Sequence, residues 1–342
     1  MKLMIVSKKD IPNLLDKMIA EYDVLAPVKK DNFTVFKPIA SGADAVLGEG
    51  NTKLPAKELF FPQSEKLFSY SVTEEGAKLD APMDDKKKVL FGVRPCDARS
   101  LKLLDNVFDN DKFQDPYYLT RRANTVMVGI GCNMPSSTCF CTSVNSGPFD
   151  TSGLDILLVD TGDAYVVELV TDKGKALADQ AGLAAASDAD KTAAAAAKEA
   201  AVVTCQVNTD GLKAKLDVNF YDPIWEKIHE KCLGCGACTY LCPTCHCFDI
   251  VDDAVDCAGC RVRNWDSCAF PLFTLHGSGH NPRTSNKERY RNRIMHKFKY
   301  FVDNFNEIGC VGCGRCIKNC PVNMDIRVVL ENIRGSEARL DS

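Results

Sequence analysis

Two cysteine runs with identical spacing carry the clearest chemical signal in the sequence. The first is Cys232-x2-Cys235-x2-Cys238-x3-Cys242-Pro243, and it recurs as Cys310-x2-Cys313-x2-Cys316-x3-Cys320-Pro321. Glycines stand at matching places in both runs, namely Gly234, Gly236, Gly312 and Gly314. In bacterial proteins this spacing holds two [4Fe–4S] clusters, because three thiolates reach one cluster while the fourth cysteine reaches the other.

The spacing therefore predicts two [4Fe–4S] clusters with crossed ligands. We assign the first cluster to Cys232, Cys235, Cys238 and Cys320, and the second to Cys310, Cys313, Cys316 and Cys242. Zinc is the alternative metal for these thiols, but the repeat is a poor match to zinc-site spacings. Two neighbouring clusters form an electron relay and provide neither a nucleophile nor an acid or base. The function then depends on which groups donate electrons to the clusters and accept electrons from them.

The overall composition indicates an intracellular globular chain rather than a secreted disulfide scaffold. Its 342 residues, 45% of them hydrophobic, can build cores without disulfides, so the 18 cysteines are better explained as metal ligands in a reducing compartment. The N-terminus lacks the apolar run of a signal peptide, and no segment approaches the roughly 18 apolar residues of a membrane span. We expect a cytoplasmic protein. Its net charge of −4 gives no general attraction for nucleic acid.

Four more cysteines follow two apolar segments that read as buried strands. Residues 89–93 lead into Cys96, and residues 125–130 lead into a loop that contains Cys132, Cys139 and Cys141. If these strands are neighbours in a parallel sheet, both loops open at the same carboxyl edge, where α/β folds place their sites. We therefore expect a third [4Fe–4S] cluster at these four cysteines. The alternative is a set of reduced thiols around a substrate or flavin pocket.

The two ferredoxin-type runs are separated by 67 residues that contain five further cysteines. Cys257 and Cys260, with Cys268 and either His276 or His280, could form another metal site. The interpretation we favour is that Cys245, Cys247 and Cys268 are small buried thiols near a cluster. Residues 283–299 hold seven Lys or Arg side chains against one acid. This basic run is either a solvated helix face or a segment that docks a partner or tunes a cluster.

The remaining patterns predict the elements that position these cysteines. Residues 1–180 alternate strands and helices, with a helix after Asp10, another opened by Asp97, and a hairpin at 154–170. For residues 181–231 we predict an alanine-rich peripheral helix or helical spacer and a short lead-in helix carrying Trp225 and Ile228. A disordered low-complexity linker is the alternative for the alanine-rich part. Residues 232–334 form the cluster-binding part, with an insertion at 243–309. The predicted fold is an α/β N-terminal domain followed by a bacterial two-[4Fe–4S] ferredoxin-like α+β domain with a long insertion.

Taken together, these motifs resemble a family of iron–sulfur electron-transfer subunits. The family includes the iron–sulfur subunit of anaerobic sulfite reductase, the beta subunit of NAD(P)-linked sulfhydrogenases, and the iron–sulfur subunit of flavin oxidoreductases that partner heterodisulfide reductase. The resemblance is carried by Phe91–Arg99, Thr138–Ser143, Cys242–Cys245, Trp265–Cys268, Gly279–Pro282 and the terminal ferredoxin motif. These stretches lie within residues 88–330, which is most of the chain. Their combination is specific, whereas Cys257 and Cys260 lie outside the family's pattern.

The resemblance implies a subunit that relays electrons in an anaerobic oxidoreductase complex. Its partners would be a flavin/NAD(P)H-binding subunit and a terminal reductase, hydrogenase or heterodisulfide reductase subunit. The chain has no nicotinamide or flavin fingerprint of its own, because Gly129-x-Gly131 is followed by Met134, and Gly48-x-Gly50 by Lys53, where a third glycine is needed. A flavin bound through loops without a motif is left open.

Two other functions compete with the relay. The chain could itself reduce sulfite, sulfur or a disulfide at a cysteine-ligated cluster, although it lacks the adjacent Cys-Cys-Gly elements of heterodisulfide-reducing subunits. It could also be a regulator whose clusters are structural or sense redox state, although it has no recognisable DNA-reading module. The sequence does not identify the terminal electron acceptor or the direction of electron flow.

Overall fold

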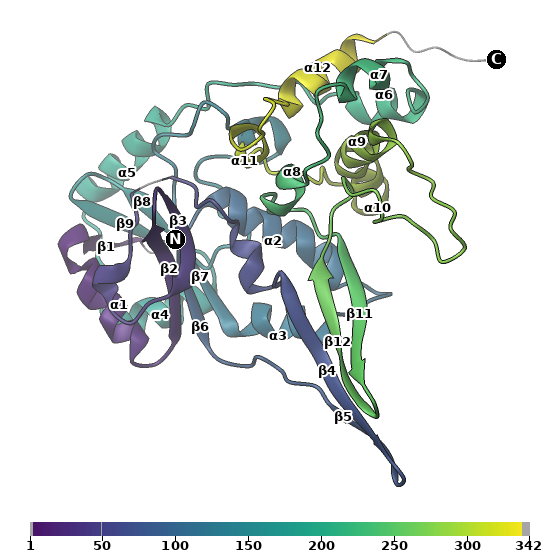
Figure 1. Ribbon diagram of the computed structural model, residues 1–342. Coiled ribbons are helices and arrows are strands. Elements are labelled where there is room, and N and C mark those ends of the chain that lie inside the picture. The colour runs from purple at the N-terminus through teal and green to yellow at the C-terminus, as the bar shows by residue number, and fades with distance from the viewer. Residues whose placement is uncertain (1–2, 49, 337–342) are drawn as a thin grey trace.

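The first sheet occupies the N-terminal half of the chain (Figure 1). The structure is a computed structural model that describes residues 3–48 and 50–336. Within these residues the sheet has eight strands in the order β10-β1-β9-β8-β7-β6-β2-β3. Their bounds are β1 Leu3–Ser7, β2 Asp23–Lys30, β3 Phe33–Pro38, β6 Lys88–Val93, β7 Thr125–Ile130, β8 Ile156–Asp160, β9 Ala164–Leu169 and β10 Ala184–Ala185. Strands β2, β6, β7 and β8 pair in parallel, and the outer pairs are antiparallel.

Helices cover both faces of this sheet, which explains why its central strands are apolar throughout. On one face α1 (Ile11–Ile19) and α4 (Asp172–Ala181) share a core with the sheet. On the other, α2 (Pro95–Phe108), α3 (Pro116–Asn124) and α5 (Asp188–Ala200) share a second core. The alanine-rich segment thus forms α5, which packs against β8 and β9 through the buried Ala194. Its small side chains permit this close approach to the strands.

Strands from two distant parts of the chain form a second, four-stranded antiparallel sheet in the order β11-β12-β4-β5. The strands are β4 (Ser64–Thr73), β5 (Gly76–Asp80), β11 (Phe248–Val255) and β12 (Ala258–Trp265). They project from the body as an arm (Figure 1). At its base the buried Glu65 carboxylate accepts hydrogen bonds from Arg121 and Arg263. The insertion is therefore joined to the N-terminal half through a sheet and a buried ion-pair network.

The C-terminal part consists mainly of short helices. These are α6 (Leu212–Val218), α7 (Ile224–His229), α8 (Ala237–Tyr240), α9 (Asn286–Met295), α10 (Phe301–Phe305), α11 (Arg315–Lys318) and α12 (Ile326–Gly335). A π-helical turn, η5 (His296–Tyr300), joins α9 to α10, and the 3-10 turns are η1 (Lys8–Asp10), η2 (Gly42–Asp44), η3 (Ala56–Leu59) and η4 (Cys141–Val144). Trp225 and Ile228 of α7 are buried in the core of this part, as expected for a lead-in helix.

A buried ion pair connects the two halves next to the cysteines. Arg315, in the second cysteine run, donates to both carboxylate oxygens of Asp97 in α2, at 2.8 and 2.7 Å. The same guanidinium donates from Nε to the carbonyl of Thr52 at 2.9 Å. Both charged side chains are almost fully inaccessible to solvent. Because neither charge can be hydrated, each depends on the other, and the pair fixes α11 against the start of α2.

We expect Asp97→Asn to destabilise the protein strongly, because it leaves the Arg315 cation buried without an anion. The expected loss in free energy of unfolding is about 3–5 kcal/mol. Asp303→Asn is a matched control, since Asp303 pairs with Lys299 at the surface, where solvent screens the pair, and its loss should matter far less. Thermal unfolding of the anaerobic protein followed by circular dichroism compares the two variants. Equal destabilisation would show that the buried pair has no special role.

Candidate metal centres

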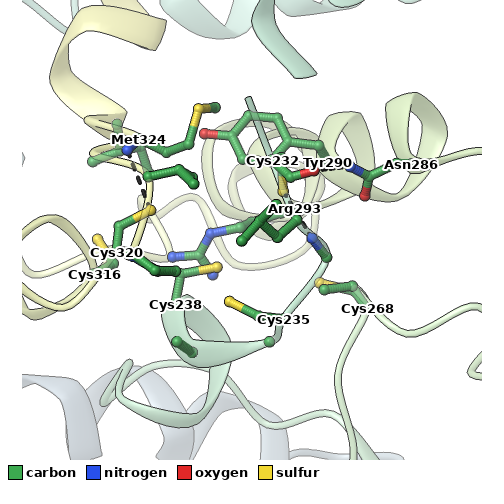
Figure 2. Close-up of a pocket in the computed structure, with 18 residues that line it drawn as sticks. Cys232, Cys235, Cys238, Cys268, Asn286, Tyr290, Arg293, Cys316, Cys320 and Met324 are labelled. Carbon is green, nitrogen blue, oxygen red and sulfur yellow. Dashed lines mark hydrogen bonds between the residues drawn. The ribbon is translucent and has the colours of Figure 1, made fainter. Parts of the chain in front are cut away.

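Four of the predicted ligands line one cavity of about 630 Å³. Cys232, Cys235 and Cys238 come from the first run, and Cys320 comes from the end of the second. Figure 2 shows their sulfurs around the same space, with Arg293 and Cys316 close by. The structure therefore brings together the set that the crossed-ligand assignment proposes for the first cluster.

Glycines with positive φ give both runs the same local shape. Gly236 and Gly314 each have φ of 73° and precede the short helices α8 and α11. Gly234 and Gly312 also have positive φ, and their amides donate to the sulfurs of Cys232 and Cys310 at 3.4 and 3.5 Å. The amide of Met324 likewise donates to the Cys320 sulfur at 3.2 Å. Amide donors of this kind stabilise sulfur in its thiolate form, which is the form that ligates iron.

The second predicted set consists of Cys242, which is buried, and of Cys310, Cys313 and Cys316, which are partly exposed. Burial raises the pKa of the Cys313 thiol to about 12, and the nearby Cys242 adds to this rise. Burial also raises the pKa of Cys316, to which the charges of Cys313, Cys242 and Cys310 contribute despite the opposing Arg293 cation. Cys242 contributes to the pKa shifts of the other three thiols, so it lies near each of them. Without a metal to deprotonate them, most thiols here would stay neutral.

Three buried cations surround these sulfurs. Lys297 Nζ donates to the Cys242 sulfur at 3.2 Å, to Thr244 Oγ1 at 2.7 Å and to the Gly309 carbonyl at 2.9 Å. Arg293 Nη1 donates to the Cys245 sulfur at 3.5 Å. Lys57 Nζ donates to the Cys245 carbonyl at 2.6 Å and lies over the Trp265 ring.

None of these three cations forms an ion pair with a carboxylate among the described residues. A buried cation is costly unless an anion lies beside it. Burial lowers the pKa of Lys57 to about 8, because removing water from the ammonium destabilises its charged form. Metal-bound thiolates would supply the missing negative charge, so the donor set and its surroundings fit iron–sulfur clusters.

The N-terminal cysteines also come together at one edge of the first sheet. Strands β6 and β7 are parallel neighbours, so the loop with Cys96 and the loop with Cys132, Cys139 and Cys141 open side by side. Burial raises the pKa of Cys141 to about 12, with further contributions from Cys139 and Cys132. Arg94 fixes this edge by donating to the Gly131 carbonyl at 2.9 Å and the Gly50 carbonyl at 3.0 Å.

The N-terminal cysteine loop touches the second run directly. The amide of Phe140 donates to the Gly312 carbonyl at 2.9 Å, and the Cys139 thiol lies 3.9 Å from the Cys313 carbonyl. A Cβ on Gly314 would lie 2.4 Å from Thr138 Oγ1, so only glycine permits this approach. A hollow of about 1150 Å³ lies over this junction and is lined by Cys132, Cys139 and Cys313.

The insertion cysteines divide into two groups. Cys257 is exposed at the turn between β11 and β12, and Cys260 lies on β12, whereas Cys268 is buried beyond the base of the hairpin. The alternative metal site at Cys257, Cys260 and Cys268 is therefore not assembled. Cys245, Cys247 and Cys268 instead line one cavity, which adjoins the first because Cys268 lines both.

Of the three buried cations, Arg293 and Lys297 lie in a segment that the sequence analysis singled out, whereas Lys57 does not. Arg293 and Lys297 belong to the basic run at 283–299, and both point to sulfurs, which favours the cluster-tuning interpretation over a purely solvated face. The π-helical turn begins between them and carries Lys297. Lys57 was missed, because it lies 188 residues from its hydrogen-bond partner Cys245 and its one sequence signal is a lysine within an apolar stretch.

The described part of the chain contains neither a compact site for a single metal ion nor a membrane-spanning helix. No three His, Cys, Asp or Glu side chains there are close enough to ligate a single metal ion. The cysteine sets instead surround wider spaces. No helix among the described residues has both the length and the apolar character needed to cross a bilayer.

Comparison with known proteins identifies relatives of both the centre and the whole chain. Residues 231–324 match the family of 4Fe-4S dicluster domains. The chain is 34% identical over 328 residues to sulfhydrogenase 2 subunit beta of Pyrococcus furiosus, an alignment that covers 94% of this chain and 96% of the relative. No solved structure matches the chain.

We expect Lys297→Met to lower the reduction potential of an iron–sulfur cluster, because a nearby cation favours the more negative reduced form. The expected shift is on the order of 60 mV, equivalent to a tenfold change in the equilibrium. Lys299→Met removes the same charge two residues away, where the ammonium pairs with Asp217 and Asp303 instead of sulfur. Redox titration followed by EPR, on samples of equal iron content, measures both. Identical shifts in the two variants would contradict a direct effect of Lys297.

Proposed function

The chain belongs to the iron–sulfur beta-subunit family of sulfhydrogenases, and from this premise we propose the partners between which it transfers electrons. It is an iron–sulfur electron-transfer subunit. We infer that it accepts electrons from, or returns them to, a flavin/NAD(P)H-binding subunit on one side and a terminal hydrogenase or reductase subunit on the other. The observation that carries this proposal is that the cysteine sets follow one another through the protein. They extend from the first cavity, through the second run, to the edge of the first sheet at β6 and β7.

The two ferredoxin-type runs would hold two clusters with crossed ligands. Each bound cluster accepts and returns one electron. The ligands we propose are Cys232, Cys235, Cys238 and Cys320 for the first cluster, and Cys310, Cys313, Cys316 and Cys242 for the second. The shared cavity and the amide donors to Cys232, Cys310 and Cys320 support this assignment.

The surrounding residues would set the energetics of the transfer. Lys297 and Arg293 place positive charge against sulfur, which favours the reduced state of a neighbouring cluster. Their burial also keeps water away, so the field they exert is less screened than at a surface. Thr244 orients the Lys297 ammonium by accepting its hydrogen bond and by donating its own to the Gly309 carbonyl at 2.8 Å.

A third cluster at Cys96, Cys132, Cys139 and Cys141 would extend the relay to the surface. The backbone contact between Phe140 and Gly312 supports a short path to the second cluster. Cys132 and Cys139 line the hollow over this junction, whereas Cys235 and Leu233 are exposed at the first cavity. These two exposed ends suit docking of two different subunits, one at each end.

We expect Cys139→Ser to remove about four irons per chain, because each [4Fe–4S] cluster depends on its thiolate ligands. The EPR signals of the ferredoxin-type pair should remain. Cys205→Ser is the matched control, since Cys205 lies outside every proposed set and should change nothing. Iron analysis of anaerobically purified protein provides the measurement, and unchanged iron in Cys139→Ser would reject the third cluster.

The same variants test the relay when the complex is isolated. The wild-type chain should co-purify with a flavin-containing subunit and be reduced when NAD(P)H is added. Cys139→Ser should assemble equally well but be reduced more slowly, because the connection to one end is lost. Isolation of the chain without any flavoprotein, hydrogenase or reductase subunit would contradict the proposed partners.

A further inference from the structure

Three thiols that the two ferredoxin-type runs do not use converge on a second cavity, which adjoins the first because Cys268 and Arg293 line both. Cys245 and Cys247 follow the first run directly, and Cys268 approaches from beyond β12. All three line a space of about 300 Å³. Cys245 and Cys268 are only 7% and 5% exposed, and the Cys247 and Cys268 thiols are close enough to shift each other's pKa. Their proximity is therefore produced by two separate segments of the insertion.

The walls of this cavity are positively charged. Arg293 and Lys297 line it, and the Arg293 guanidinium contacts the Cys245 sulfur at 3.5 Å. No Asp or Glu is among the described residues that line it. Such a site would repel a bare divalent cation but suits a group whose thiolate ligands give it a net negative charge. This favours an iron–sulfur cluster over a single metal ion.

A histidine beside the thiols has the hydrogen bond expected of a ring held near a metal. His246 Nδ1 lies 3.1 Å from the Thr244 carbonyl, which can only accept, so Nδ1 carries the proton and Nε2 keeps a free lone pair. The His296 ring stands against it at 5.1 Å between centroids. Both imidazoles line the cavity together with the three thiols.

The local sequence repeats that of the N-terminal cysteine loop. Thr244-Cys245-His246-Cys247 has the same Thr-Cys-x-Cys spacing as Thr138-Cys139-Phe140-Cys141. Further cysteines complete both places: Cys132 from the start of the same loop and Cys96 from another loop at one site, and Cys268 from beyond β12 at the other. The cavity in the insertion therefore has three cysteines, one fewer than the N-terminal set.

We propose that Cys245, Cys247 and Cys268 hold a further [4Fe–4S] cluster through three thiolates, with its fourth iron facing His246 and His296. A surface hollow of about 760 Å³ shares Cys247 and both histidines with the cavity, so the fourth iron is reached from solvent. This site goes beyond the proposed relay, whose clusters are ligated by other cysteines. Its loss would leave the ferredoxin-type pair and the N-terminal set in place.

Iron and acid-labile sulfide in anaerobically purified variants test the proposal. Cys268→Ser should lose about four irons per chain and keep the EPR signals of the ferredoxin-type pair. Cys257→Ser, at the exposed turn of the same insertion, is the control and should lose none. Unchanged iron in Cys268→Ser, loss of a single iron or zinc, or a Cys247–Cys268 disulfide found by mass spectrometry would overturn the proposal.

A second readout does not depend on the folding of Cys268→Ser. A cluster with three thiolates releases its fourth iron on mild oxidation, so ferricyanide should produce a [3Fe–4S] EPR signal in the wild type. The signal should persist in Cys139→Ser, which separates this site from the N-terminal set. In His246→Cys, a thiolate next to the fourth iron should suppress the signal at unchanged iron content. Absence of the signal from the wild type, or a signal of equal size in His246→Cys, would overturn the proposal.

Discussion

Buried positive charge without a carboxylate partner is the constraint on which the centre of this protein depends. Lys57, Arg293 and Lys297 come from widely separated segments, yet all three are directed at the sulfurs or backbone of the Cys242–Cys247 segment. Desolvation of each ammonium or guanidinium is offset only by a permanent anion nearby. Thiolates bound to iron supply such an anion, so cluster assembly and stability of the folded chain are expected to be coupled.

The two halves of the chain meet through contacts that leave little freedom of position. Gly312 and Gly314 lie against the backbone of the N-terminal cysteine loop, and Arg315 is buried against Asp97. The second sheet joins residues 64–80 to the insertion. Electron transfer depends on short and constant separations between redox centres, and a rigid junction provides them. The ferredoxin-type part is therefore built into the α/β part rather than attached to it by a flexible linker.

Local patterns in the sequence predicted the elements that depend on neighbouring residues. The apolar strands β6 and β7, the hairpin of β8 and β9, and the helix beside Cys96 all follow from short-range periodicity. That helix begins at Pro95, so Asp97 lies in its first turn instead of opening it. The expected shared edge of the four N-terminal cysteines depended on β6 and β7 being parallel neighbours. The structure confirms that these two strands are parallel neighbours. The four-stranded arm was not predicted, because β12 pairs with β4 across 187 to 200 residues and β5 and β11 are exposed throughout. Lys57 was missed for the same reason, since its partners are defined only by the tertiary fold.

The crossed cysteine ligands remain a prediction, and the proposed electron transfer depends on the pair of clusters that they would bind. Iron and acid-labile sulfide analysis of the anaerobic protein, combined with EPR after dithionite reduction, tests for this pair most directly. A pair of crossed clusters should give iron and sulfide in equal amounts, at about eight or more of each per chain, and a spectrum of magnetically interacting reduced clusters. Stoichiometric zinc without sulfide, or reduced clusters that show no interaction, would contradict the prediction.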